Sequence, residues 1–408
     1  MTSNDIDILL DVSRTVSRLG AGGDSGVDRV ERAYIRHLLA QDSPVHFLSR
    51  VLGGVALLDR QGMFALLDPA SPDRTDILGH LARRQSPARR RAETRVRRLA
   101  KGWARYSRVP AFLREALPNG FIYLNTGHSN LDADHLRRIR AAGAVRIAVL
   151  VHDVIPLDYP EFSRPEAPAR FERLLKGIAA QADLLIYNSA DTARRTADWL
   201  SKWGVERPGV TALLGVDPLP SQSAEQRLEH PYFVVLGTIE PRKNHLLLLS
   251  IWRQFWEAQT PEQTPHLHII GRRGWENEMV LDVLDRAPFM GHTVFEHGFV
   301  SDGELASRLA NAHALLFPSF AEGFGYPLAE ALQMGRPVIS ADLPVYREIA
   351  PKGPTYLDPL DGPAWRSAIA SASLRPLKPE KSTAGAVEMP DWLSHFEKVF
   401  QALRRGDE

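Results

Sequence analysis

The sequence predicts an α/β protein with two domains, each built around a parallel β-sheet. Its 408 residues exceed what one hydrophobic core usually accommodates, so two domains of roughly 200 residues each are expected. Short apolar runs that end in Gly, Ser, Asn or Asp alternate with longer helical patterns, which is typical of βα units. These units fall into two series, separated by an irregular stretch that contains prolines.

Each series contains five candidate strands. In the first half they lie at residues 6–12, 45–49, 121–125, 146–151 and 184–188. In the second half they lie at residues 233–236, 267–270, 293–296, 314–317 and 337–340. Such short, continuous apolar runs are typical of strands that are buried on both faces of a sheet.

The domain boundary is expected near residue 222, inside the proline-containing stretch 215–231. The predicted domains are therefore 1–222 and 223–388. A further pattern of spaced apolar residues predicts a last helix within 389–408, which can pack back on the N-terminal domain. Its apolar positions are Trp392, Leu393, Phe396, Val399, Phe400 and Leu403.

Composition narrows the class of protein. Hydrophobic residues make up 44% and charged residues 24%, which are ordinary values for a folded globular chain. The sequence has no cysteine, which excludes disulfides, thiolate metal sites and thiol catalysis and fits a reducing compartment. The first apolar run, at residues 6–10, is short and lacks a basic flank, so no signal peptide is expected. No run approaches the ~20 apolar residues of a membrane span, and a cytoplasmic location is expected.

The most specific pattern occupies residues 317–332, which run from an apolar strand through a glycine turn into a helix with Pro327 near its start. The N-terminus of that helix presents backbone N–H groups and a positive dipole end, which suit a diphosphate. Glu322 in the turn and Glu330 in the helix are acceptors for hydroxyl-rich ligands. The alternative is that Glu330 only complements the helix dipole and Glu322 is a solvated loop residue.

The segment from Glu322 to Glu330 resembles the E-x7-E signature of the retaining glycosyltransferase family four. The resemblance continues through residues 298–302, 317–319, 335–339 and 346–348 and covers most of the C-terminal half. It implies the GT-B fold, in which two Rossmann-like domains face each other across a cleft. The first domain then binds mainly the acceptor, and the second binds the nucleotide-sugar donor.

The resemblance also implies roles for individual residues. Glu330 is expected to bind the nucleotide ribose, and Glu322 is expected to hold the donor sugar. The remaining donor-binding positions are Gly26, Thr238, Arg242, Lys243, Gly271, Arg272, Phe299, Gly323, Phe324, Gly325, Tyr326 and Leu328.

Arg242 and Lys243 stand between a strand and the helix that is expected to begin near Asn244. Two cations at this place can neutralise a diphosphate and stabilise it as it leaves with the nucleotide. The family commonly has an arginine directly after the strand's glycine, where this sequence has Thr238. The guanidinium is then expected from Arg242, as in the Glu-Pro-Arg-Lys-Asn variant of bacterial polysaccharide mannosyl- and rhamnosyltransferases. Arg272 and Arg273 are rival sources, and a solvated Arg-Lys pair is the alternative.

The N-terminal half offers a glycine-rich loop at residues 20–26 and two histidines at strand ends. The loop lacks the spacing of a dinucleotide fingerprint, so it is either a connector or, as the resemblance implies, a wall of the donor site. His152 is expected to donate a hydrogen bond to a sugar hydroxyl or to developing charge, with Asp153 orienting it. His128 is the second strand-end candidate. The expected catalytic residues are His152, Glu322, Lys243 and Arg242.

Two other charged segments need an interpretation. Asp132 and Asp134 match a D-x-D metal motif, but their place before a helix predicts that they cap it, and no metal is expected. Residues 81–108 hold eleven cations, including Arg83 and Arg108, against one acid. This basic segment is either a solvated helix face or a contact with an anionic membrane surface. Nucleic acid is not expected, because aromatic residues for base stacking are scarce there.

The function expected from the sequence is a retaining, metal-independent hexosyltransferase. GDP-mannose is the favoured donor, with UDP- or dTDP-linked hexoses as alternatives, and no cofactor is needed. The expected acceptor is a saccharide or a polyprenyl-diphosphate-linked sugar in the assembly of a bacterial surface polysaccharide such as lipopolysaccharide or capsule. A nucleotide-sugar 2-epimerase and an inactive scaffold subunit are the other classes.

Overall fold

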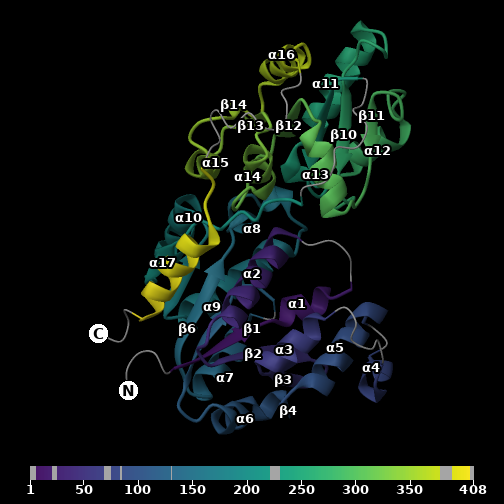
Figure 1. The fold of residues 1–408 in the computed structure, drawn as a ribbon. Coiled ribbons are helices and arrows are strands. Elements are labelled where there is room, and N and C mark those ends of the chain that lie inside the picture. Colours follow the sequence, from purple (N-terminus) through teal and green to yellow (C-terminus); the bar gives the residue numbers. More distant parts are fainter. Residues whose placement is uncertain are drawn as a thin grey trace.

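The computed structural model describes residues 6–20, 25–68, 75–82, 85–129, 131–220, 230–376 and 388–404. They form two α/β lobes arranged end to end, with the N-terminal lobe purple to teal and the C-terminal lobe green to yellow-green (Figure 1). The last helix, drawn in yellow, returns to the N-terminal lobe. No helix in the described ranges is both long and apolar enough to cross a membrane.

The N-terminal sheet has eight strands in the order β4-β3-β2-β1-β5-β6-β7-β8. Six neighbouring strands are parallel, namely β2, β1, β5, β6, β7 and β8. The other two, β3 and β4, add an antiparallel edge. The strands are β1 Asp7–Asp11, β2 Val45–Val51, β3 Gly54–Leu58, β4 Gly102–Arg105, β5 Phe121–Asn125, β6 Ala144–Val151, β7 Leu184–Tyr187 and β8 Gly209–Thr211.

Ten α-helices accompany this sheet. They are α1 Ser13–Arg18, α2 Gly26–Ala40, α3 Arg60–Leu67, α4 Ile77–Leu81, α5 Pro87–Leu99, α6 Val109–Ala116, α7 Ala133–Ala141, α8 Ile155–Asp158, α9 Ala167–Gln181 and α10 Ala190–Lys202 within the described residues, with 3-10 turns η1 Tyr106–Arg108 and η2 Pro160–Phe162.

The C-terminal sheet has six strands, all parallel, in the order β11-β10-β9-β12-β13-β14. Its strands are β9 Tyr232–Leu236, β10 His266–Ile270, β11 Val294–Glu296, β12 Ala314–Phe317, β13 Val338–Ala341 and β14 Thr355–Leu357. Its helices are α11 His245–Ala258, α12 Glu278–Arg286, α13 Asp302–Ala310, α14 Tyr326–Gln333, α15 Pro344–Ile349 and α16 Gly362–Ser373, with the 3-10 turn η3 Pro241–Lys243.

All ten predicted strands are present, and four further strands escaped the prediction. β4, β8 and β14 are edge strands of three or four residues with few buried side chains, so they leave no apolar run in the sequence. β3 follows β2 through a tight turn at Gly53, whose φ of 82° lies in the left-handed region. This hairpin adds an antiparallel edge to the predicted parallel sheet, because β2 continues directly into β3.

The final helix, α17 Trp392–Arg404, packs against α2 and β8 of the N-terminal lobe. The His395 ring lies between Tyr34, whose hydroxyl is 2.7 Å from Nε2, and the carbonyls of Ala212 and Leu213, both 3.1 Å from Nδ1. At its C-terminal end, Arg146 donates to the carbonyls of Ala402 and Leu403. The helix is thus fixed at both ends by N-terminal residues.

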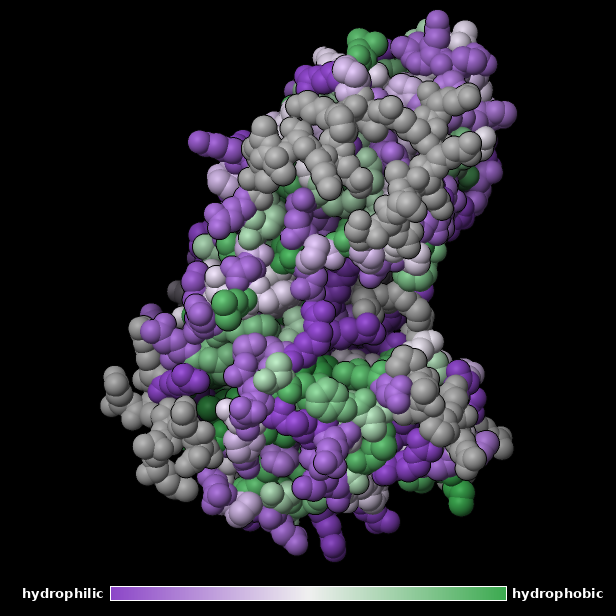
Figure 2. All heavy atoms as spheres, viewed as in Figure 1, coloured by the Kyte–Doolittle hydropathy of each residue, from purple (hydrophilic) through white to green (hydrophobic). Residues whose placement is uncertain are grey.

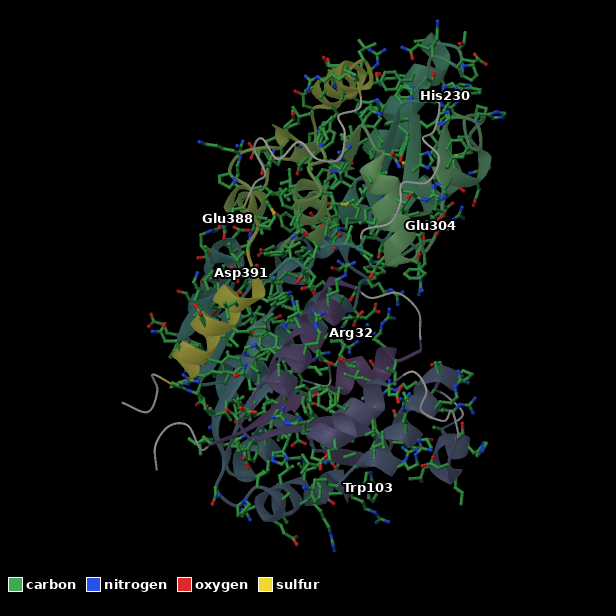
Figure 3. The ribbon with its side chains drawn as sticks, in the orientation of Figure 1. Arg32, Trp103, His230, Glu304, Glu388 and Asp391 are labelled. Carbon is green, nitrogen blue, oxygen red and sulfur yellow. The ribbon has the colours of Figure 1, made fainter. Side chains whose placement is uncertain are left out.

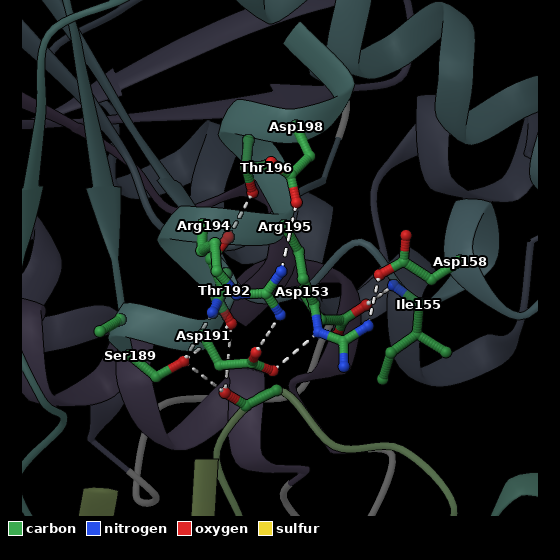
Figure 4. A network of polar contacts seen from close by, with 12 residues as sticks. Asp153, Ile155, Asp158, Ser189, Asp191, Thr192, Arg194, Arg195, Thr196 and Asp198 are labelled. Atoms are coloured by element: carbon green, nitrogen blue, oxygen red, sulfur yellow. Dashed lines mark hydrogen bonds and ion pairs between the residues drawn. The ribbon is translucent and has the colours of Figure 1, made fainter. Parts of the chain in front are cut away.

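Direct contacts join the two lobes. Both carboxylate oxygens of Glu348, on α15, accept backbone N–H groups at the start of α10, at 2.7 Å each. Behind this contact, Asp191 accepts from Arg194 and Arg195, and Arg195 also binds Asp158 (Figure 4). A carboxylate at a helix N-terminus satisfies N–H groups that lack an intrahelical partner, so α15 caps a helix of the other domain.

The basic segment is largely engaged inside the N-terminal lobe. Arg97 binds Asp76 at 2.6 Å, Arg89 binds Glu93 at 3.0 Å, and Arg95 donates to the carbonyls of Ala65 and Asp68. The contacts of Arg97 and Arg95 fasten α3 and α4 to α5, so only part of the segment forms a solvated face. Arg83 and Arg84 lie outside the described residues. Trp103, on β4 in the same segment, lies at the end of the lobe far from the C-terminal domain (Figure 3).

Candidate donor cleft between the two lobes

A cleft of about 440 Å³ lies between the lobes, where the strands of both sheets end. Figure 2 shows the molecule narrowing at this level, with an indentation on one side. In Figure 3 Arg32 on α2 and Glu304 on α13 mark the two sides of the gap. Ligands of open α/β sheets bind outside the carboxyl ends of the strands, so this is the expected place for a functional site.

The N-terminus of α14 forms part of the C-terminal wall. Gly325 precedes the helix with a φ of 113°, and Tyr326 and Pro327 are its first residues. Gly323 in the turn lies against the N-terminal domain: a Cβ built there would be 2.3 Å from the carbonyl oxygen of His152. Only glycine allows this approach, so the turn that follows β12 brings both domains into backbone contact.

Glu322 lies between the two predicted cations. Its Oε2 is 2.8 Å from Nη1 of Arg242, and its Oε1 accepts from Nζ of Lys243 and, at 2.9 Å, from the Ser319 hydroxyl. Burial raises the pKa of Glu322, but the two cations outweigh it and lower the pKa to about 2. Burial lowers the pKa of Lys243, and Glu322 opposes that shift. The structure thus holds a carboxylate and two cations side by side in the cleft.

Glu330 is paired differently. It is the fifth residue of α14, its side chain is only 2% exposed, and its Oε1 accepts from Nη1 of Arg29, on α2 of the N-terminal lobe. Burial raises the pKa of Glu330, and Arg29 opposes the shift. The two glutamates of the motif therefore have cations from different domains.

The far end of the cleft is formed by loops that follow β9, β10 and β11. Thr238, Gly271 and Arg272 line it together with Phe299, and the Arg272 guanidinium lies 5.2 Å from the centre of the Phe299 ring. Phe299 is half exposed. Such a flat, partly apolar wall suits a nucleotide base. Arg273, the other rival cation, turns away to Glu296 and Asp285, at 2.8 and 2.7 Å.

His152 lines the cleft, but not as a hydrogen-bond donor. Its Nε2 is 2.7 Å from the carbonyl oxygen of Thr126, which can only accept, so Nε2 carries the proton. Burial lowers the pKa of His152 well below its usual range. The neutral ring therefore offers Nδ1 as an acceptor, which corrects the expectation that His152 donates to the substrate.

Asp153 does not orient His152 either. Its Oδ1 accepts the backbone N–H of Ile155 at 3.1 Å, and burial raises its pKa. His128 lies behind His152, with ring centres 5.0 Å apart, and is absent from the residues that line the cleft. Burial lowers the pKa of His128 to about 4. Of the two strand-end histidines, His152 is the one that faces the cleft.

The other predicted positions fall into two groups. Leu328 is fully buried beneath the cleft, so it supports α14 without facing a ligand. The cleft wall contains Gly26, Thr238, Gly271, Gly323, Phe324, Gly325 and Tyr326, whereas residues 21–24 of the glycine loop lie outside the described residues.

Asp132 caps α7, with its Oδ1 accepting from the backbone N–H of His135 at 2.8 Å. Asp134 binds Arg138 at 2.9 Å. Within the described part of the chain, no group of three or more His, Asp or Glu side chains is arranged to hold a metal ion.

The sequence prediction assigned no role to several polar residues of the cleft. Arg18 and Arg29 come from the N-terminal lobe, Asn188 donates to the His152 carbonyl at 2.8 Å, and Asp302 begins α13. Arg29 had a sequence signal: a cation in the first turn of a helix opposes the helix dipole, which suggests another use for it. The others have no comparable signal.

Comparison with known proteins finds similar sequences and similar folds. Residues 220–358 match the family model described as glycosyl transferases group 1. The matched stretch makes up most of the C-terminal domain. This domain contains β9 to β14 and the paired residues Glu322 and Lys243.

Two relatives are mannosyltransferases by name. The chain is 34% identical over 277 residues to the serotype-specific mannosyltransferase WbdA of Escherichia coli, covering 64% of this chain and 31% of WbdA. It is 29% identical over 225 residues to the O-antigen chain mannosyltransferase B of Escherichia coli, covering 53% of this chain and 58% of that protein. The chain thus spans about a third of the length of WbdA.

Solved structures share this fold. The sucrose-phosphate synthase of Thermosynechococcus elongatus superposes with a TM-score of 0.61 at 16% identity, covering 98% of this chain and 99% of that one. At this identity the likeness concerns the fold alone. The chain has the GT-B fold predicted from the sequence.

Proposed function

We propose that this chain is a retaining, metal-independent glycosyltransferase that transfers mannose from GDP-mannose. The observation that carries the proposal is Glu322 held between Arg242 and Lys243 where the sheets of both lobes end. The names of the relatives support the sugar, and the resemblance of residues 240–244 to mannosyl- and rhamnosyltransferases supports the nucleotide.

In this proposal the two cations bind the donor diphosphate. They stabilise the negative charge that develops as the nucleotide leaves, because preformed donors in a site shielded from water interact strongly with a developing anion. Glu322, kept ionised by the same cations, accepts hydrogen bonds from hydroxyls of the sugar. Nδ1 of His152 accepts one more hydroxyl from the N-terminal side.

Retention is proposed to proceed by attack on the same face that the diphosphate leaves. Asp153, the cleft carboxylate beside His152, has Oδ1 bound to the Ile155 N–H and its Cβ near Gly323. That placement behind the sugar-binding turn does not suit a nucleophile on the far face of the sugar. The departing phosphate then helps to remove the proton of the acceptor hydroxyl.

Thermal unfolding of the purified protein against GDP-, UDP-, dTDP- and ADP-sugars tests the donor. A ligand at ~100 times its Kd stabilises a protein by ~2.7 kcal/mol, so binding by one nucleotide class gives a clear shift. We expect GDP-mannose to produce the shift and Glu330→Ala to abolish it. Transfer to a mannosylated acceptor, with the anomeric configuration read by NMR, tests the reaction and its stereochemistry.

The alternatives separate in the same experiment. If only UDP- or dTDP-hexoses raise the unfolding temperature, one of them is the donor in place of GDP-mannose. Conversion of the free nucleotide sugar to its C2 epimer would identify an epimerase, and the absence of any shift at saturating donor would favour a scaffold subunit. An inverted product would contradict retention.

The acceptor and location remain part of the proposal. We propose a saccharide or polyprenyl-diphosphate-linked acceptor in surface-polysaccharide assembly, bound on the cytoplasmic side. Contact with an anionic membrane is assigned to the exposed cations Arg98, Arg105 and Arg108, since neighbouring arginines are engaged internally. Co-sedimentation with phosphatidylglycerol vesicles checks this, and replacing all three by Gln should abolish it.

A further inference from the structure

The helices α2 and α14 meet across the cleft with their first turns side by side. Gly26, the first residue of α2, lies against the ring of Tyr326, the first residue of α14: a Cβ at Gly26 would be 3.2 Å from that ring. One turn further along each helix, Arg29 meets Glu330. The N-terminal turn of α2 is itself fixed by a capping box between Ser25 and Asp28.

Among the described residues, every partner of the Arg29 guanidinium belongs to the C-terminal domain. Nη1 donates to Glu330, Nη2 is 3.7 Å from Oδ1 of Asp302, and the guanidinium carbon lies 5.9 Å from the centre of the Tyr326 ring. Glu330 is 2% exposed, whereas Asp302 is 64% exposed. The buried partner is therefore the one for which the arginine matters most, because an unpaired buried carboxylate is strongly destabilised.

The ion pairs of the two motif glutamates differ in whether they require contact between the two lobes. Glu322 takes its cations from η3 of its own domain, so that pair exists whatever the distance between the lobes. The cation of Glu330 comes from the other domain, so this pair exists only when α2 lies against α14. The nucleotide-facing carboxylate thus depends on the approach of the two domains.

We propose that Arg29 is a positioning residue for the donor, which orients the Glu330 carboxylate toward the ribose hydroxyls only when the two lobes are closed. The inference rests on the proposed function, because it assigns the ribose to Glu330. Ribose recognition and closure of the cleft are then one event. A donor without ribose hydroxyls gains nothing from the contact.

The charges around Glu330 give this role a pH signature. Arg29 on α2 lowers the pKa of Glu330, whereas burial and Asp302 on α13 raise it; Tyr326, one turn earlier on α14, is a neutral phenol because burial raises its pKa. Without Arg29 the carboxyl takes up its proton at a higher pH. A protonated carboxyl is a weaker acceptor for hydroxyls, so donor binding in a variant without Arg29 weakens as the pH falls.

Isothermal titration with GDP and with 2′,3′-dideoxy-GDP tests the inference, with UDP and its dideoxy form used if the wild type prefers uridine. The wild type is expected to prefer the ribonucleotide by roughly 10- to 100-fold, the value of hydrogen bonds to a charged group. Arg29→Met and Glu330→Gln should each reduce the preference to about twofold or less. The double variant should lose no more than either single one, and Arg29→Lys should restore part of the preference.

Arg36→Met is the matched control, because Arg36 lies on the same helix and pairs with Asp217 at 2.5 Å on the exposed surface. It should leave both affinities unchanged. A wild type that binds no nucleotide would refute the proposed function itself. A wild type that prefers the ribonucleotide, with Arg29→Met keeping that preference at pH 6 and pH 8 while Glu330→Gln loses it, would overturn the inference alone.

Discussion

The motif glutamates show how partners decide the chemistry of a residue. Glu322 and Glu330 are both buried, yet the pKa of Glu322 falls to about 2 while that of Glu330 is raised. The difference follows from two adjacent cations on Glu322 against one cation and a neighbouring acid on Glu330. In the proposed complex, the donor sugar and the nucleotide ribose are thus expected to bind carboxylates that differ in strength as hydrogen-bond acceptors.

Lys243 is the residue whose loss should affect the chemical step most directly. In the proposed reaction its ammonium group stabilises the leaving diphosphate, so Lys243→Met should reduce kcat about 100- to 1,000-fold. The measurement is the initial rate of transfer from GDP-mannose at saturating donor. Lys243→Arg should recover part of the rate because the charge remains.

The control for this change is Lys176→Met, which removes a lysine of the exposed Lys176–Glu172 pair on α9, outside the cleft. Surface pairs of this kind contribute little, so the rate should match the wild type. Equal rates for Lys243→Met and Lys176→Met would refute the assignment of Lys243 to the leaving group.

At the residue scale, the sequence could identify side chains but not their partners. Glu322, Lys243 and His152 stood out because each follows a strand that ends at the cleft. The proton on Nε2 of His152 depends on the carbonyl of Thr126, and the pairing of Arg29 with Glu330 joins residues 301 positions apart. No local pattern encodes either contact, since both arise from the packing of separate elements.

At the element scale, burial decides which strands can be predicted from the sequence. Strands buried on both faces, such as β6 and β12, are continuous apolar runs and could be predicted from the sequence. Edge strands need few apolar residues, so β4 could not be distinguished from the basic segment around it. The amphipathic pattern of α17 predicted a helix, whereas its docking on α2 depends on the buried His395.

Docking of α17 should make the stability of the protein depend on pH. Nδ1 of His395 donates to backbone carbonyls and Nε2 accepts from Tyr34, so the buried ring is neutral. Burial lowers its pKa from 6.5 to about 4. Below pH 6.5 the unfolded chain binds a proton that the folded chain does not, so this stabilisation is complete above pH 6.5 and is lost as the pH falls toward 4.

The expected loss from this one group is about 3 kcal/mol of unfolding free energy between pH 7 and pH 4. Urea unfolding of the wild type and of His395→Gln at both pH values measures it. Glutamine can donate and accept but does not titrate, so the wild type should lose about 3 kcal/mol more than the variant. Equal losses in the two proteins would contradict the buried neutral ring.

At the scale of the whole molecule, close contacts join the two lobes. Gly323 lies on the carbonyl of His152, Glu348 caps α10, and Phe162 stacks on Phe320 with ring centres 5.3 Å apart. The first of these contacts joins the turn that carries Glu322 to the end of β6, where His152 lies. We call the Glu322 side and the His152 side of the cleft the two half-sites. The distance between them is therefore set by the absence of a side chain at Gly323.

Adding one methyl group at this contact should separate the half-sites. In Gly323→Ala the new Cβ would lie 2.3 Å from the His152 carbonyl oxygen, a backbone atom held by Asn188, so the lobes must move apart. A displacement of ~1 Å at a reacting centre costs ~100-fold in rate, so kcat/KM should fall by about that factor while the radius of gyration from small-angle scattering rises.

Gly362→Ala is the control, because its Cβ would meet only the Leu247 side chain at 3.6 Å, an ordinary contact. If Gly323→Ala keeps the radius and the rate of that control, the backbone contact does not set the spacing of the lobes.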